Sequence, residues 1–173
     1  MPSSEEIDAF VEKIIIEGAR DSVKGGKEGE PEMPMPCFFT FGETDGGGEI
    51  GVMPIARDFS EPRVKAEIIG ALKQLKKEKP FHTVIFVSDT HFKEYKGKTS
   101  QEAMAEREKF DGRLSEDPTS KEAIIVAKIT ARGGSTIMIE YKRTDDGKIE
   151  FQEPQEQIGI HSSWMTRIWD EVN

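Results

Sequence analysis

Apolar residues recur every three or four positions at the start of the chain, which predicts a docked helix over residues 4 to 23. Ser3 and Glu6 have the spacing of a capping box just before that run. The residues expected on the buried face are Ile7, Phe10, Val11, Ile14 and Ile15. Residues 24 to 36 are rich in Gly, Pro and charge, lack an apolar period, and are predicted to be a flexible connector.

Two apolar runs around a Gly-rich acidic turn predict a β-hairpin, with strands near 37 to 41 and 49 to 55. The turn, GETDGGGE, lacks the ligand spacing of a calcium loop and the lysine of a P-loop, so it is interpreted as a simple turn. A second helix follows, with Ser60 as its N-cap and Pro62 in its first turn. Its apolar stripe is expected to comprise Val64, Ile68, Ala71, Leu72 and Leu75.

Residues 84 to 87, VIFV, are apolar without alternation, which indicates a central strand covered on both faces. A densely charged excursion over 93 to 120 follows it. The capping-box spacing of Thr99 and Glu102 predicts a short surface helix near 100 to 110 within that excursion. Three strands in an antiparallel meander and a short C-terminal helix complete the chain.

This order of elements, α-β-β-α-β-(α)-β-β-β-α, predicts one domain over residues 1 to 173 in the α+β class. We expect a mostly antiparallel five- or six-stranded sheet with helices packed on it. The order is similar to that of the roadblock and profilin-like sandwiches, whose members mostly work as dimerising or scaffold modules. That resemblance concerns element order, and a fold does not by itself carry a function.

The composition of the chain argues against several classes of function. The net charge is −9, and affinity for nucleic acid rests largely on Lys and Arg, so we expect no nucleic-acid partner. The start of the chain lacks the pattern of a signal peptide, and no stretch approaches the roughly 20 apolar residues that span a membrane. These features predict a cytoplasmic protein without membrane contact. Cys37, the single cysteine, begins a predicted buried strand and is interpreted as inert.

The sequence SDTH, residues 88 to 91, closes the predicted central strand and resembles the Asp-x-His that opens calcineurin-like phosphoesterases. The resemblance implies Asp89 and His91 as ligands of a divalent metal, with His161 as a further candidate, because such ligands hold an ion beside a bridging water. The later motifs of that family do not follow in order in this chain. The alternative interpretation is that Asp89 and His91 are strand-exit residues that cap the backbone.

A longer resemblance runs from about residue 81 to 152. It is similar to a loose group of uncharacterised bacterial and phage proteins, in which an acidic Ser-x-Asp-Pro turn precedes a Glu-Ala strand and a strand ending in Tyr-x-Arg-x-x-Asp-Gly. The matching positions are Ser115, Asp117, Pro118, Glu122, Ala123, Tyr141, Arg143, Asp146 and Gly147. The group implies no activity. Ser115 and Asp117 are also expected to bond local backbone groups in the turn.

Two classes of function remain open at this stage. The first is a non-catalytic interaction or self-association module, with a homo-oligomer or a protein as partner and no cofactor. Two tryptophans in the C-terminal helix motivate it, since such a helix either docks on its own sheet or anchors an interface. The interface candidates are Trp164, Met165, Ile168 and Trp169. The alternative is a divalent-metal-dependent phosphoesterase that uses Asp89, Thr90 and His91.

Overall fold

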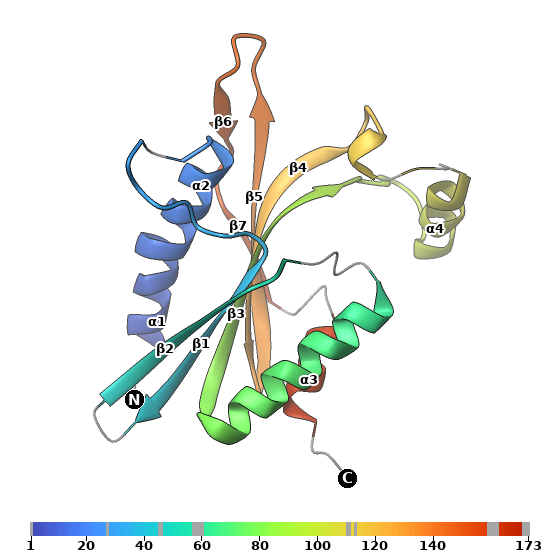
Figure 1. Cartoon of the computed structure of the whole chain (residues 1–173). Coiled ribbons are helices and arrows are strands. Elements are labelled where there is room, and N and C mark those ends of the chain that lie inside the picture. The colour runs from blue at the N-terminus through green and yellow to red at the C-terminus, as the bar shows by residue number, and fades with distance from the viewer. Residues whose placement is uncertain are drawn as a thin grey trace.

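An antiparallel sheet is the framework of the molecule (Figure 1). The computed structural model describes residues 2–26, 28–44, 47–56, 61–109, 112, 114–158 and 163–170. Within these ranges the sheet has seven strands in the order β2-β1-β3-β4-β5-β6, and β7 also pairs with β5. The strands are β1 (Cys37–Thr44), β2 (Gly47–Pro54), β3 (Phe81–Phe92), β4 (Lys121–Thr130), β5 (Gly133–Arg143), β6 (Ile149–Phe151) and β7 (Gln155–Ile158). The α+β class is confirmed, with one strand more than expected because the last strand segment divides into β6 and β7.

Strand β3 is the central strand that the VIFV run predicted. It pairs antiparallel with β1 on one side and with β4 on the other, so its backbone groups are satisfied from both directions. Val84, Ile85 and Val87 have no exposed surface, and Phe86 is also buried. Successive side chains point to opposite faces of a strand, so a continuous apolar run requires cover on both faces.

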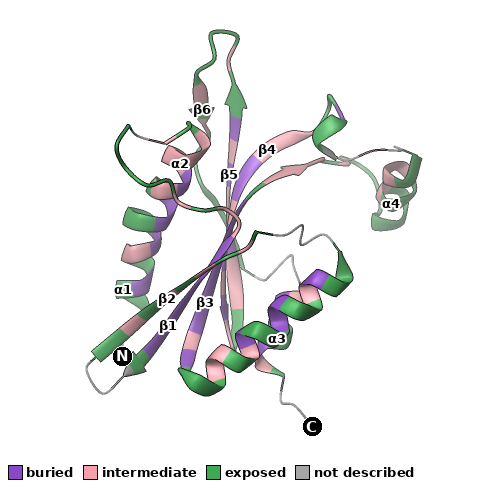
Figure 2. Cartoon of the chain, in the orientation of Figure 1, coloured by how far each residue is buried: buried purple, intermediate pink, exposed green. Residues whose placement is uncertain are grey.

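Two helical layers provide that cover (Figure 1). One face holds a continuous helix made of α1 (Ser4–Phe10), the π-helical segment η1 (Val11–Ile16) and α2 (Glu17–Val23). The opposite face holds α3 (Pro62–Glu78) and the short 3₁₀ helix η3 (Ser163–Trp169). Buried residues therefore concentrate along the middle strands, between these layers (Figure 2). We call the two apolar clusters the first core, under the N-terminal helix, and the second core, under α3 and η3.

The N-terminal helix departs from the predicted apolar face at one position. Ile14, expected to be buried, is 51% exposed, whereas Ile16 is buried. The cause is η1, because a π-helical turn spaces residues by about five and so places Ile16 in line with Val11. The predicted capping box is confirmed, since the Glu6 N–H donates to Ser3 Oγ and the Ser3 N–H donates to Glu6.

The second helix differs from its prediction in one buried residue. Ala71 is exposed, and the buried positions are Val64, Ile68, Ile69 and Leu72. The stripe that faces the sheet is therefore rotated around the helix toward Ile69 and away from Ala71. The expected N-cap, Ser60, lies outside the described residues, and the helix begins at Pro62 with Glu61 before it.

Two connecting segments are tied to the rest of the fold. In the predicted connector, Met33 and Met35 pack against the first core, and the Ser22 hydroxyl donates to the Met33 carbonyl at 2.9 Å. The charged excursion holds α4 (Ser100–Lys109) and the 3₁₀ turn η2 (Leu114–Glu116). The capping box at Thr99 and Glu102 is confirmed, and α4 buries none of its residues. No described helix is both long and apolar enough to cross a membrane.

Gly42 marks a close approach between chain segments and gives the first prediction. It lies where the β1 and β3 register shifts, and a Cβ there would collide with the Pro80 carbonyl oxygen. We expect Gly42→Ala to lower the free energy of unfolding by about 1–3 kcal/mol, because backbone on both sides must move. The matched control is Gly70→Ala in α3, where a Cβ meets nothing within 4 Å. That change should stabilise the protein by up to about 1 kcal/mol. Urea denaturation of both variants measures the difference, and equal effects would contradict it.

Candidate functional site

The sheet register brings the polar residues after VIFV together with residues of the two following strands. Asp89 and His91 lie on the same face of β3 as Ile85 and Val87, which is the face of the first core. His91 is paired with Glu122 on β4, and Glu122 is paired with Tyr141 on β5. His91, Glu122 and Tyr141 thus form one row across three strands, and Asp89 lies on the same face one row away. We call the group formed by Asp89, His91, Glu122, Tyr141 and Arg143 the polar cluster.

Tyr141 is the centre of the polar cluster. Its ring is 2% exposed and packs against Phe151 with centroids 5.7 Å apart. Its hydroxyl donates to Asp89 Oδ1 at 2.7 Å and lies 3.4 Å from Glu122 Oε1. Arg143 Nε donates to Glu122 Oε2 at 3.2 Å, and His91 Nε2 lies 3.7 Å from Glu122 Oε1. Both carboxylates of the cluster are therefore engaged within it.

The electrostatics of the cluster hold Tyr141 in its neutral form. Burial raises the pKa of Tyr141 far above its usual range, and the hydrogen bond and the negative charge of Asp89 raise it further. The charge of Glu122 adds to this effect, while that of Arg143 partly opposes it. A general base or nucleophile needs a pKa near or below the working pH. This environment makes Tyr141 a permanent hydrogen-bond donor that joins three strands.

The metal hypothesis stays a prediction. Asp89 and His91 do share a face of β3, as a pair of ligands requires, but the Asp89 carboxylate accepts the Tyr141 hydroxyl. His161 lies outside the described residues. Within the described ranges, no three side chains of His, Cys, Asp or Glu converge in a way that could hold a metal ion.

Asp89, Glu122, Tyr141 and Arg143 were each singled out from the sequence, but their proximity in space was not predicted. The alternation of side chains along each strand could have indicated that these residues share one face. If β3, β4 and β5 are assumed to pair as a meander, alternate residues of each strand share one face. The missing information was the register, which depends on how the long charged excursion between β3 and β4 closes.

Asp117 joins the two ends of the charged excursion over residues 93 to 120. Its Oδ1 accepts hydrogen bonds from the Thr119 N–H at 2.8 Å and from the Thr119 hydroxyl at 2.7 Å. Its Oδ2 accepts from Lys93 Nζ at 3.0 Å, which joins the start of the excursion to its end. The bonds from Thr119, followed by the one from Lys93, lower the pKa of Asp117 to about 2. The expected local backbone bond in the turn is confirmed for Asp117.

The C-terminal residues proposed as an interface pack on the protein's own second core. Met165 and Ile168 are each 1% exposed. Trp164 packs edge-on against Phe38, with centroids 6.4 Å apart, and Trp169 packs against Phe81 at 5.8 Å. Lys76 Nζ lies 4.2 Å from the centroid of Trp169. Of the two alternatives for this helix, docking on its own sheet accounts for the observed contacts.

A surface that was not predicted from the sequence lies at the edge of the sheet. Strand β2 ends the sheet on one side, and among the described residues no strand pairs with its outer edge. Ile50 and Val52 are 46% and 55% exposed on this strand. They are paired with Phe41 and Phe39, so they share the face of the first core. We call Gly48, Ile50, Val52 and Pro54 the β2 edge.

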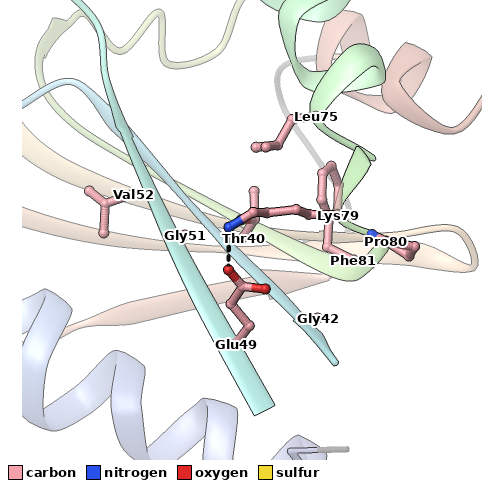
Figure 3. A pocket seen from close by; sticks show the side chains of 9 residues that line it. All are labelled: Thr40, Gly42, Glu49, Gly51, Val52, Leu75, Lys79, Pro80 and Phe81. Atoms are coloured by element: carbon pink, nitrogen blue, oxygen red, sulfur yellow. Dashed lines mark hydrogen bonds and ion pairs between the residues drawn. The ribbon is translucent and has the colours of Figure 1, made fainter. Parts of the chain in front are cut away.

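The opposite face of β2 borders a small pocket of about 160 Å³ beneath the end of α3 (Figure 3). Glu49, the only charged residue of β2, points into it and pairs with Lys79 at 2.7 Å. This hydrogen bond raises the pKa of Lys79. Gly51 lies beside it, and a Cβ there would come within 2.5 Å of Thr40 Oγ1. Glu49 therefore directs the charge of β2 into this pocket, which Val52 also lines (Figure 3).

Comparison with known proteins found no match: no family model, no curated protein and no solved structure is similar to this chain.

The second prediction concerns Tyr141. We expect Tyr141→Phe to lower the free energy of unfolding by about 1–2 kcal/mol at pH 7, because a hydrogen bond to a charged group is lost. The pKa of Tyr141 is raised on folding, so its contribution is complete below the unfolded value of about 10 and is lost as pH rises beyond it. From this group alone the wild type should lose about 1.4 kcal/mol per pH unit above pH 10.

The gap between wild type and Tyr141→Phe should therefore narrow with rising pH. Urea denaturation from pH 7 to 11 measures it. Tyr95→Phe is the control, since it changes the other tyrosine of the chain and should leave stability almost unaltered at pH 7. A gap that stays constant up to pH 11 would show that Tyr141 titrates normally.

Proposed function

We propose that this chain is a non-catalytic interaction module and that its binding surface is the β2 edge. The observation that carries the proposal is the exposure of Ile50 and Val52 on the last strand of the sheet. An exposed apolar edge strand is a template for pairing with a further strand, and soluble proteins normally protect such an edge. The surface suits an extended segment that adds to the sheet.

The backbone of β2 supports this proposal. The Ile55 N–H donates to the Pro36 carbonyl at 3.0 Å, toward β1. Because the backbone groups of an antiparallel strand alternate sides, those of Ile50 and Val52 then point away from β1. The same two residues thus offer outward N–H and C=O groups together with exposed apolar side chains. Main-chain bonds would give affinity, and the two side chains would give specificity.

The other end of the sheet differs from the β2 edge in strand length and in polarity. There the outer strands β6 and β7 have three and four residues, against eight for β2. They carry Glu150 and Glu156, and short, charged strands resist pairing. The β2 edge is the longer and less polar of the two.

The polar cluster supports a structural role for the residues that resemble a catalytic motif. Tyr141 is held neutral, and Glu122 is neutralised by Arg143. Asp89 accepts the hydroxyl of Tyr141 at 2.7 Å. These contacts satisfy the polar side chains at this end of β3, β4 and β5, so the cluster has a structural explanation.

The third prediction tests whether the β2 edge accepts a strand. A phage-displayed library of linear eight-residue peptides is selected against the immobilised full chain. We expect enrichment of peptides with alternating β-branched residues, because these fit beside Ile50 and Val52. Fluorescence anisotropy of a selected peptide should show binding that Val52→Lys abolishes.

Ile158→Lys is the matched control for that experiment. It places the same charge at an exposed isoleucine, 98% exposed, on β7 at the other side of the sheet. Peptide binding should survive this change. The proposal fails if protein immobilised at a density too low for self-association enriches no peptide, or if Val52→Lys and Ile158→Lys bind the selected peptides equally well.

A further inference from the structure

We propose that the strand added to the β2 edge is β2 of a second copy of this chain, in an antiparallel register that sets Ile50 opposite Val52 of that copy. The inference rests on the proposed function and specifies its partner. The two sheets would join into one continuous sheet related by a two-fold axis. Such an isologous contact requires a surface that is complementary to itself.

The β2 edge meets that requirement through its alternation. In an antiparallel pair of identical strands, outward-facing residues must meet outward-facing residues. Setting Ile50 opposite Val52 of the second copy also sets Val52 opposite Ile50 and Gly48 opposite Pro54. Each Ile50 and Val52 pair can exchange both of its backbone hydrogen bonds. Pro54, which lacks an N–H, falls at the end of the ladder, where only its carbonyl is needed.

Side chains select this register over its neighbours. A shift that sets Ile50 opposite Ile50 leaves each Val52 facing Gly48, which has no side chain. A shift in the other direction sets Val52 opposite Val52 and pairs each Ile50 with Pro54, which cannot donate. The proposed register alone gives every exposed Ile50 and Val52 a β-branched partner directly opposite, where cross-strand contacts stabilise a sheet most.

The two-fold axis would pass between the two copies of Gly51. A glycine suits this position, since a Cβ would lie 2.5 Å from the Thr40 hydroxyl oxygen. The opposite face of the joined strands is therefore open at its centre. Glu49, beside it, is already paired with Lys79 at 2.7 Å, so pairing of the two strands would not bring unpaired charges together. The chain carries a net charge of −9, which makes this locally neutral strand the favourable place for two copies to meet.

The N-terminal helix adds to the same face. Phe10 packs edge-on against Phe41 at 5.4 Å and against Phe39 at 6.1 Å, the β1 residues paired with Ile50 and Val52. The helical layer over β1 therefore borders the β2 edge. Ile14, four residues after Phe10, is 51% exposed in that layer because of η1. The N-terminal helix thus carries an exposed isoleucine in the layer that packs on β1.

The fourth prediction is the oligomeric state of the full chain. Light scattering and sedimentation velocity over a range of concentrations should show a dimer for the wild type. Val52→Lys should raise the dimer dissociation constant at least about 100-fold, because a lysine at the centre of a strand pair must lose its hydration. Ile158→Lys should leave the dimer unchanged. Since Val52 is 55% exposed, circular dichroism at low concentration should be the same for all three proteins.

Cross-linking tests the register. Ile50→Cys and Val52→Cys proteins are mixed under mild oxidation, and the products are resolved by mass. The mixed Ile50→Cys with Val52→Cys dimer should form faster than either symmetric dimer. Cys37 should not interfere, because it is buried and burial raises its pKa to about 11. Faster formation of the symmetric Ile50→Cys dimer would overturn the register.

The outcomes separate this inference from the function on which it rests. A wild type that stays monomeric yet binds selected peptides at the β2 edge would overturn pairing between copies and leave the interaction module standing. A wild-type dimer that Val52→Lys does not weaken would also overturn the inference. A monomer that binds no peptide would remove both.

Discussion

The pairing of β3 with β1 and β4 is the interaction on which the rest of the structure depends. From Thr83 to Val87, β3 is paired on both sides, so none of its apolar residues there can turn toward solvent without breaking a ladder. Both faces must be covered, and the two helical layers follow from that need. A slip of one residue would exchange Ile85 and Val87 for Val84 and Phe86 between the first and second cores. The register is therefore fixed by burial on both faces at once.

The same constraint explains why the two margins of the sheet differ. Where β3, β4 and β5 extend beyond the N-terminal helix, their side chains on that face become polar and bond one another across strands, with Tyr141 joining the apolar core to Asp89. That margin is closed by hydrogen bonds and ion pairs. Along the edge of β2 no such closure exists among the described residues, because Ile50 and Val52 are apolar and Glu49 pairs with Lys79 on the other face. The sheet thus ends in polar contacts at one margin and in exposed apolar side chains at the other.

Short-range sequence patterns predicted the features that local interactions determine. They missed the features that depend on strand pairing or on an irregular helical turn. The buried strand at VIFV, the capping boxes at Ser3 and Thr99, and the α+β class follow from short-range sequence and are confirmed. Ile14 was assigned to the buried face because an α-helical period was assumed, whereas η1 shifts that period. The polar cluster could not be assembled because His91 and Glu122 come together only through the register of β3 with β4. The β2 edge was missed for a related reason: the hairpin was predicted, but which of its strands would lie outermost depends on the pairing of β1 with β3.

Strand β2 lacks the features that commonly protect an edge strand from pairing. Edge strands in soluble proteins are commonly short, bulged, or marked by lysine, and β2 is eight residues long with no lysine and a regular register to β1. Its only interruption is the terminal Pro54. An apolar edge of this kind favours unspecific pairing unless a specific partner covers it, since the outward backbone groups do not discriminate among strands. The large negative charge of the chain would slow random encounters between copies. Discrimination would then depend on the side chains, because only a strand that sets β-branched residues opposite Ile50 and Val52 gains burial as well as hydrogen bonds.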